Sequence, residues 1–389
     1  MDKIKPMQKK NMYVSNENPL INQILNSKEI KGKVYITYNI CETCNLNCLF
    51  CCIDDKFHSK KFVSIYNSDK ILNKINEKYG IDTIFIMANE PTTQPNLSNH
   101  IIKYAINHNI KIKIVSNGYA SKLVYKQMLN GINPKDIDKI TISLDSMEED
   151  IHNKLRNNSN SYQQAIKIIK FLKENNYNIR IQMTICDINY DTILNSVQQL
   201  NHIYGIKNFA FHCMSISNRA KNNGLNHINP FKWRKLVRQL FELKNNLDDI
   251  EEYSIPIIAM TENELLKLYF GGNKRALNDF FSGVPAKMCP AINGNNLYIK
   301  ADDDKVYISR CQILFDTEKV YSYNFDYNEN TLKKVKTMND YEFIIESQHL
   351  CPAIKNEINS NIDYYEDDKG TKLYYVCRVL LANESDLDF

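Results

Sequence analysis

The sequence predicts an α/β protein whose mainly parallel sheet is followed by a smaller, cysteine-rich α+β domain. Short β-branched and aromatic runs alternate, from about Lys33, with segments whose apolar residues recur at helical spacing. This alternation stops near Asn218, and short strands, turns and four cysteines follow from Met288 onward. Strands joined by helices form right-handed βαβ units in a parallel sheet, which is either open or closed into a barrel. In both arrangements ligands bind at the carboxyl ends of the strands.

The expected strands are short and separated by helical segments. They cover residues 33–40, 83–87, 110–115, 140–144, 179–185 and 209–213. In the expected helix 161–175, Ala165, Ile168 and Leu172 fall on one face. The chain then divides into an N-terminal extension (1–32), a core (33–225), a mainly helical connection (226–285, with its clearest helix at 231–243) and a cysteine-rich domain (286–389).

The composition favours a cytoplasmic globular protein. Of the 389 residues, 43% are hydrophobic and 24% are charged, and a net charge of +4 gives no reason to expect nucleic acid or a membrane as partner. We expect neither a secretory signal peptide nor a transmembrane helix, because the chain lacks an early apolar stretch and any apolar run of roughly 18 residues. Cytosolic thiols stay reduced, so the eleven cysteines indicate metal or redox chemistry rather than disulfides.

The first expected strand leads directly into a loop that is rich in cysteine. The gaps of three and two residues between Cys44, Cys48 and Cys51 allow one loop to surround a single [4Fe-4S] cluster. Three ligands, instead of four, leave one iron open to another molecule. A structural zinc site and buried cysteines acting as small hydrophobic residues are the alternatives, although zinc fingers usually have a second Cys-x2-Cys pair nearby, which is missing here.

This Cys-x3-Cys-x2-Cys pattern, with Phe50 before its last cysteine, resembles the signature of the radical S-adenosylmethionine (SAM) superfamily. The resemblance covers about residues 33–220 and implies a partial (β/α)6 barrel. It implies that the three cysteines bind three irons of the cluster, that SAM chelates the fourth iron, and that Phe50 lies near the adenine. Cys41 and Cys52 fall outside the pattern and are expected to be structural or to lie behind the ligands.

The end of the second expected strand carries a segment similar to one by which this family binds SAM. Ala88-Asn-Glu-Pro91 resembles Gly-Gly-Glu-Pro, so backbone carbonyls at Ala88 and Asn89 and the carboxylate of Glu90 are expected to bind the SAM ammonium. Both glycines are replaced; alanine fits if φ stays negative, and asparagine also accepts positive φ. From the residues alone, the segment is a strand that ends at a proline.

Two further strand ends resemble the family's SAM-binding segments. Ser116-Asn117-Gly118 is similar to Thr-Asn-Gly, which implies that Ser116 and Asn117 contact the cofactor, although alone it is only a turn signal. The Ser-Leu-Asp run that begins at Ser143, with Arg156 after it, resembles a segment that implies Ser143 at the SAM ribose and Arg156 at its carboxylate. From the residues alone, Arg156 is equally a solvated helix residue.

One further residue and one further segment follow these strand ends in the chain. His152, which lies between Ser143 and Arg156 in the chain, is expected to be structural rather than catalytic. Asn218-Arg-Ala220 resembles the Gly-Arg-Ala segment of radical SAM proteins with cysteine-rich C-terminal domains, with asparagine in place of glycine.

The last hundred residues contain the widely spaced Cys289, Cys311, Cys351 and Cys377. Between the first two, residues 297–311 form an expected hairpin with acidic residues 302–304 at its turn. This arrangement resembles the opening of SPASM or Twitch domains, which hold auxiliary iron–sulfur clusters. The dense later cysteine group of a full SPASM domain is missing, so a Twitch-like domain with one auxiliary cluster on these four thiolates is expected. Buried cysteines and a four-cysteine zinc site are the alternatives.

The resemblance implies an enzyme that cleaves SAM reductively at the cluster and abstracts a substrate hydrogen atom. Our first hypothesis for the substrate is a ribosomally made peptide that is epimerised, cross-linked or oxidised, with electrons from a donor such as flavodoxin or ferredoxin. Cys186 and Cys213, near two strand ends, are candidate catalytic hydrogen-atom donors, with buried strand cysteines as the alternative. Oxidation or rearrangement of a sugar or small metabolite is a second enzyme hypothesis. A non-catalytic iron–sulfur or zinc protein is the third, favoured by the altered Ala88-Asn89 pair.

Overall fold

The structure is a computed structural model of the whole chain. It describes residues 4–5, 32–51, 53, 59–214, 218–226, 228–247, 250–255, 257–269, 272–275, 296–303, 306–309, 321–326, 331–334, 364–366 and 369–377.

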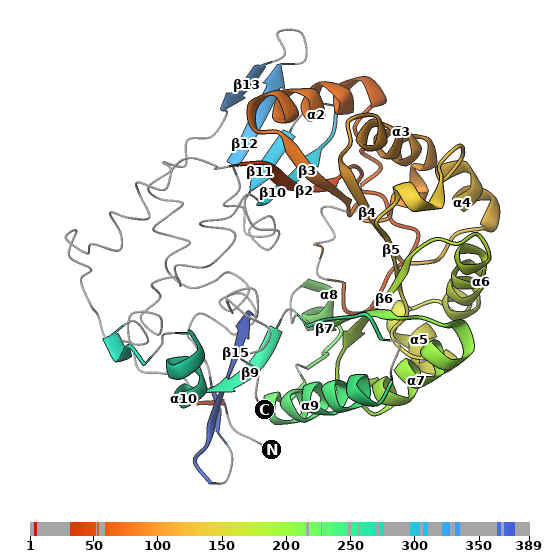
Figure 1. Cartoon of the computed structure of the whole chain (residues 1–389). Coiled ribbons are helices and arrows are strands. Elements are labelled where there is room, and N and C mark those ends of the chain that lie inside the picture. The colour runs from red at the N-terminus through yellow and green to blue at the C-terminus, as the bar shows by residue number, and fades with distance from the viewer. Residues whose placement is uncertain are drawn as a thin grey trace.

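A curved sheet of eleven strands organises the described part of the chain (Figure 1). Seven of its strands run parallel and lie side by side in chain order: β2 (Val34–Asn39), β3 (Ile81–Ile86), β4 (Lys111–Ser116), β5 (Lys139–Ser143), β6 (Ile179–Ile185), β7 (Asn208–Cys213) and β8 (Glu252–Ser254). The first six agree within two residues with the strands expected from the sequence. The predicted α/β architecture with a parallel, partly barrel-like sheet is therefore confirmed.

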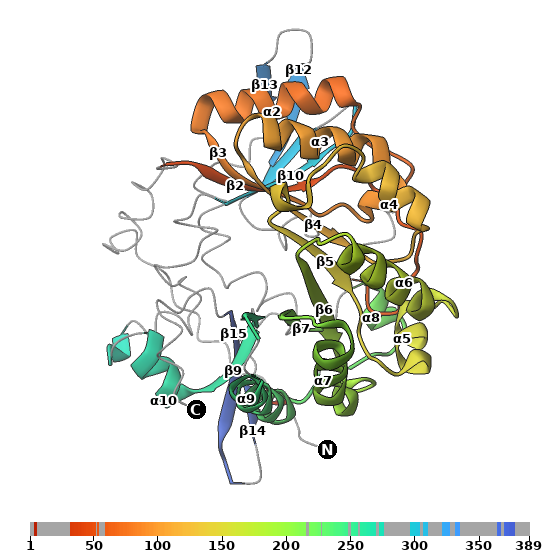
Figure 2. The same ribbon diagram turned by 45° about the vertical axis from the view of Figure 1, so that its right-hand side comes forward.

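Helices cover the convex face of this sheet, as the two views in Figures 1 and 2 show. In chain order they are α2 (Ile65–Tyr79), α3 (Pro95–Asn107), α4 (Lys122–Met128), α5 (Glu149–Arg156), α6 (Ser161–Glu174), α7 (Ile193–Tyr204) and α9 (Pro230–Asn246). The short α8 (Asn218–Asn222) lies instead beside the cysteine loop. Several helices begin at side-chain caps; Ser64 and Ser121, for example, accept the backbone N–H groups of Asn67 and Val124.

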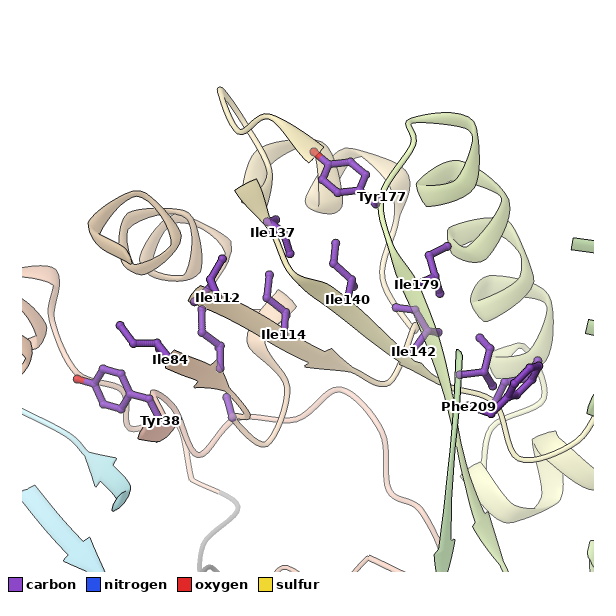
Figure 3. Close-up of a cluster of buried hydrophobic side chains, with 14 of the residues drawn as sticks. Tyr38, Ile84, Ile112, Ile114, Ile137, Ile140, Ile142, Tyr177, Ile179 and Phe209 are labelled. Atoms are coloured by element: carbon purple, nitrogen blue, oxygen red, sulfur yellow. The ribbon is translucent and has the colours of Figure 1, made fainter. Parts of the chain in front are cut away.

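The core lies between the sheet and these helices. Side chains alternate along each strand, so the isoleucines at 84, 112, 114, 140 and 142 all point to the helical face, where none has any exposed surface (Figure 3). The intervening positions face the concave side and are more polar. There Arg180 donates to Thr141 Oγ1 at 3.1 Å and to Glu252 Oε1 at 3.4 Å, and Lys139 also pairs with Glu252.

The C-terminal strands extend the same sheet at the β2 edge. β10 (Asn296–Ala301) lies parallel to β2, and β11 (Val306–Ser309), β12 (Tyr321–Asp326) and β13 (Thr331–Lys334) continue outward in antiparallel order. The hairpin predicted over 297–311 is thus confirmed as β10 and β11, joined near Asp302 and Asp303. A second sheet of four strands is formed by β1 (Ile4–Lys5), β14 (Tyr364–Glu366), β15 (Lys372–Cys377) and β9 (Ile257–Thr261).

Residues 226–285, expected to be mainly helical, include two strands that were not predicted. The helix expected at 231–243 is present within α9, but β8 and β9 follow it, and α10 (Glu262–Glu264) continues into a π-helical turn at Leu265–Tyr269. β8 is a strand because it pairs with β7, with Tyr253 opposite Phe209, and such pairing is a tertiary effect that three residues of sequence do not reveal. Of the helices in the described ranges, none has the length and apolar character needed to cross a membrane.

Candidate active site

The loop after β2 brings Cys44, Cys48 and Cys51 to the carboxyl end of the parallel sheet. Three separate elements hold this loop in place. Leu49 donates its backbone N–H to Leu155 O in α5 at 3.0 Å, and Asn223, after α8, donates to Leu49 O at 2.9 Å. Asn45 donates to the backbone carbonyl of Tyr119, after β4. The loop is therefore fixed from three sides.

Two of the three sulfurs accept hydrogen bonds, one from the residue that follows β4 and one from the last residue of α5. Asn117 Nδ2 lies 3.7 Å from Cys44 Sγ, and Arg156 Nη1 lies 3.8 Å from Cys48 Sγ. Burial, with a smaller contribution from Glu90, raises the pKa of Cys44 to about 12, and burial also raises the pKa values of Cys48 and Cys51. Without a metal the thiols are therefore protonated, and metal binding must release these protons.

This donor set fits a [4Fe-4S] cluster. Its ligands are thiolates, and N–H groups directed at sulfur stabilise the negative charge that thiolates carry. In the described ranges no three His, Cys, Asp or Glu side chains are grouped to hold a single metal ion. Cluster cysteines each bind a different iron, so they need not converge on one point as the ligands of a zinc ion do.

Glu90, expected at the SAM ammonium, is already bound by donors of the protein. Its side chain is only 1% exposed, and Oε1 accepts hydrogen bonds from Thr92 N, Thr92 Oγ1 and Ser116 Oγ at 2.7–3.0 Å. Oε2 accepts the backbone N–H of Asn117 at 2.7 Å. Burial raises the pKa of Glu90 in spite of these bonds. The carboxylate therefore ties the end of β3 to the end of β4.

The expected SAM contacts Ser116 and Asn117 belong to the same network. Ser116 Oγ also lies 2.6 Å from the hydroxyl of the buried Tyr125, in α4. Asn117 donates to Asn45 Oδ1 at 2.8 Å as well as to Cys44. The structure thus connects Glu90, through Asn117, to the first cluster cysteine.

Arg156 is likewise bound to a buried carboxylate. Its Nε and Nη2 donate to the two oxygens of Asp145 at 2.6 and 3.0 Å, and its guanidinium carbon lies 5.1 Å from the centre of the Phe50 ring. Burial opposes the charge of Arg156, but Asp145 and Cys48 outweigh it and raise its pKa. Asp145 is fully buried and also accepts the N–H of Thr184 at 2.9 Å. Arg156 is therefore not a solvated helix residue.

His152 supports the other side of Asp145, as expected of a structural residue. Its Nδ1 accepts the backbone N–H of Asp145 at 3.1 Å, which assigns the ring proton to Nε2. Nε2 is buried and has no hydrogen-bond partner within the described ranges. Burial, assisted by Arg156, lowers the pKa of His152 to about 4, so the ring is neutral at pH 7.

The remaining expected SAM contacts lie around the same strand ends. Ser143, the last residue of β5, is 5% exposed. Ala88 is 8% exposed, and Asn89 donates its backbone N–H to Cys41 O and its side-chain N–H to Glu42 O, so this segment packs on the cluster loop. In the described ranges, positive φ outside glycine occurs only at Asn109, Asn157 and Asn176, so Asn89 does not need it.

The other described cysteines are buried. Cys41 is 1% exposed, and its sulfur contacts Thr43 O, Glu90 O and Thr93 Oγ1, which supports a structural role. Cys186 is 2% exposed and packs in a small apolar cluster with Leu155, Met214 and Ala220.

Cys213 shares a face of β7 with Phe209 and Phe211, and all three belong to the helix-side core. Cys52, Cys289, Cys311 and Cys351 lie outside the described residues, as does the side chain of Cys377.

Three groups near the site were not expected to act there. Asp145 appeared in the sequence only as part of a motif, and its opposite charge to Arg156 was the available signal. The charge of Arg219, in α8, lowers the pKa of Cys51 against the effect of burial. Lys300, in β10, pairs with Glu42 Oε1 at 2.6 Å, directly beside the cysteine loop. Nothing in the local sequence links Lys300 to a residue so distant in the chain.

Comparison with known proteins defines the class of this site. Residues 38–200 match the family model described as the radical SAM superfamily. This family uses a [4Fe-4S] cluster together with SAM, in agreement with the cysteine loop described above. The resemblance on which the sequence predictions rested is confirmed.

Two relatives extend the comparison. The subtilosin biosynthesis protein AlbA of Bacillus subtilis is 24% identical over 264 residues, which are 68% of this chain but only 57% of AlbA. Streptococcus suis SuiB, in a crystal structure with its precursor peptide SuiA, aligns over 88% of this chain and 74% of its own, with a TM-score of 0.58 and 15% identity. SuiB bound to S-adenosylmethionine gives a TM-score of 0.56 over 86% and 71% of the two chains. At 15% identity, the comparison with SuiB shows that the two chains share a fold.

Proposed function

We propose that the chain is a radical SAM enzyme in which Cys44, Cys48 and Cys51 hold the [4Fe-4S] cluster. The observation that carries this proposal is the three-cysteine loop at the carboxyl end of the parallel sheet, with Asn117 and Arg156 donating to two of its sulfurs. When bound, the cluster and SAM supply one-electron cleavage of SAM and removal of a hydrogen atom from the substrate.

The residues around the loop have separate parts in this proposal. Carbonyls of Ala88 and Asn89, with Glu90 Oε2, receive the SAM ammonium; Oε2 has one protein donor and retains capacity for another. Ser143 contacts the ribose, and Phe50 lies near the adenine. The apolar cluster around Phe50, Leu155 and Met214 excludes water from this side of the site.

We propose a ribosomally made peptide as the substrate. AlbA is named for the biosynthesis of a bacteriocin, and SuiB was crystallised with a precursor peptide. The reaction is epimerisation, cross-linking or oxidation, with a small electron-transfer protein such as flavodoxin or ferredoxin as reductant. Buried Cys186 is the better placed of the two proposed hydrogen-atom donors, because Cys213 shares the helix-side face.

Anaerobic reconstitution followed by incubation with SAM and dithionite tests the enzyme proposal. We expect 5′-deoxyadenosine to form, and to fall below detection in Cys44→Ala, Cys48→Ala and Cys51→Ala. Cys41→Ala is the matched control, because this thiol lies in the same loop but, among the described residues, its polar contacts are to backbone carbonyls and Thr93. Absence of 5′-deoxyadenosine from wild-type protein with a full cluster would favour a non-catalytic iron–sulfur protein, and zinc in place of iron would refute the cluster.

We also propose an auxiliary cluster on Cys289, Cys311, Cys351 and Cys377. Wild-type protein should then contain roughly eight irons per chain, and the variant lacking Cys44, Cys48 and Cys51 roughly four. A triple variant without iron would refute the second cluster.

A further inference from the structure

The two side chains that touch cluster cysteines share one design. Asn117 follows β4 and Arg156 ends α5, yet each directs an N–H group at a sulfur, at 3.7 and 3.8 Å. Each is also fixed by a buried carboxylate: Glu90 accepts the backbone N–H of Asn117, and Asp145 binds Arg156 at two points. The donors are thus held in place before any cofactor binds.

This geometry leaves the guanidinium of Arg156 with few free directions. Nε and Nη2 are directed at Asp145, Nη1 at Cys48 Sγ, and one face lies over Phe50. A carboxylate ligand such as that of SAM is best bound by the two-point fork of a guanidinium, and in Arg156 that fork is already occupied by Asp145.

We infer that Arg156 and Asn117 act on the cluster rather than on SAM, by hydrogen-bonding Cys48 and Cys44 and so raising the reduction potential of the cluster. This inference rests on the cluster assignment proposed above. Reduction adds negative charge to the cluster, and both an N–H donor and a cation stabilise the reduced form more than the oxidised form. Arg156 supplies a donor and a charge, whereas Asn117 supplies only a donor. The effect of Arg156 should therefore be larger.

A redox titration without SAM separates this role from a SAM contact. The full-length protein is reconstituted anaerobically, and the paramagnetic signal of the reduced cluster is followed against applied potential. The variant lacking Cys44, Cys48 and Cys51 gives the signal of any other cluster, which is subtracted. At the wild-type midpoint, we expect Arg156→Gln to lower the ratio of reduced to oxidised cluster at least about tenfold, equivalent to 59 mV for one electron.

Two more variants ensure that the conclusion does not depend on Arg156→Gln alone. Asn117→Leu keeps the backbone N–H to Glu90 but removes the side-chain donor, and should lower the ratio about threefold. Arg156→Lys keeps the charge without the fork and should lie between Arg156→Gln and wild type. Arg180→Gln is the matched control, since Arg180 pairs with Glu252 and Thr141 on the concave face and should leave the potential unchanged.

The possible results are distinct. If Arg156→Gln and Asn117→Leu keep their iron and titrate like wild type, the inference is wrong. A weakened affinity for SAM with an unchanged potential would also overturn it, and would return Arg156 to the SAM carboxylate. If Arg156→Gln loses the cluster, the test rests on Asn117→Leu and Arg156→Lys. A lowered ratio of reduced to oxidised cluster in either variant supports the inference. If both variants titrate like wild type, the inference is wrong. A wild-type protein with no reducible cluster in this loop would instead refute the proposed function.

Discussion

The strand ends of the core and the C-terminal hairpin contact the cysteine loop in different ways. At the strand ends, the buried carboxylates of Glu90 and Asp145 hold side chains that reach the sulfurs themselves. The β10–β11 hairpin reaches the backbone and flanks of the loop region: Lys300 pairs with Glu42, and Asp303 accepts Ser64 N and Asn67 Nδ2 at 2.7 and 2.8 Å.

This difference separates two tasks. The core sets the surroundings of the sulfurs, whereas the hairpin fixes where the loop lies against the sheet. Disturbing the core should therefore change stability and the properties of the site together, and disturbing the hairpin should mainly loosen the loop.

The largest expected effect is in the core, at Asp145→Asn. Removing this charge leaves Arg156 as an unpaired cation in a buried position, which should lower the free energy of unfolding by about 3 to 5 kcal/mol. Anaerobic urea unfolding measures the loss. Lys232→Gln is the control, because the Lys232–Asp187 pair is about half exposed on both sides and its loss should cost less than about 1 kcal/mol. Equal losses in the two variants would remove the distinction between buried and surface pairs.

Acid should also act on the core. The pKa values of His152 and of His212, in β7, are each lowered by burial to about 4. The unfolded chain therefore binds these protons below about pH 6.5, while the folded chain does not. Stability should be complete above pH 6.5 and fall towards pH 4, by up to about 3 kcal/mol for each histidine. Urea unfolding between these pH values should give a flatter profile for His152→Gln and for His212→Leu. An unchanged profile in both would contradict the assignment.

Lys300→Met tests the hairpin side of the comparison. The pair with Glu42 is largely buried, and its loss should lower the free energy of unfolding by about 2 kcal/mol. Hydrogen exchange should quicken in the loop after Cys41, while the network around Asp145 stays protected. The double variant Lys300→Met, Glu42→Met should recover part of the loss, because no charge is then left unpaired. Faster hydrogen exchange around Asp145, instead of in the loop, would contradict the proposed division between the core and the hairpin.

The smallest expected effects are at two helix caps, one in the core and one after β9, outside the hairpin. Thr261 caps α10 in a capping box with Glu264, and Ser121 caps α4 in the core. Each substitution by alanine should lower the free energy of unfolding by about 1 kcal/mol, because each removes one acceptor for a backbone N–H. Thermal unfolding of Thr261→Ala and Ser121→Ala provides the measurement, and a clearly larger loss at one cap would show that its region unfolds with different cooperativity.

The sequence predicted most of the parallel sheet, because its strands are β-branched or aromatic runs of five or more residues with helical segments between them. It did not reveal β8 and β9, whose strand character comes from pairing with β7 and β15. Propensity carries little information over three to five residues when distant partners decide the conformation.

The site was predictable where its residues are close in the chain. The spacing of Cys44, Cys48 and Cys51 indicates one loop, and the segments at Ala88, Ser116 and Ser143 lie at the carboxyl ends of β3, β4 and β5, as expected. The bonds from Ser116 and Asn117 to Glu90 were not predictable, because these donors come from the neighbouring strand end and spacing along the chain does not report such contacts. The pairing of Arg156 with Asp145 was indicated only by their opposite charges.

The position of β10 beside β2 has a consequence for how the protein is made. β2 and Lys300, which pairs with Glu42 in the loop after β2, are separated by about two thirds of the chain. The β2–β10 pairing and the Lys300–Glu42 pair therefore cannot form until the ribosome has completed residue 300. Until then β2 has an open edge and the thiols of its loop lack one of their supports. Metal delivery to the nascent chain would therefore meet an unfinished pocket, and the finished one arises only after synthesis of the strand that closes it.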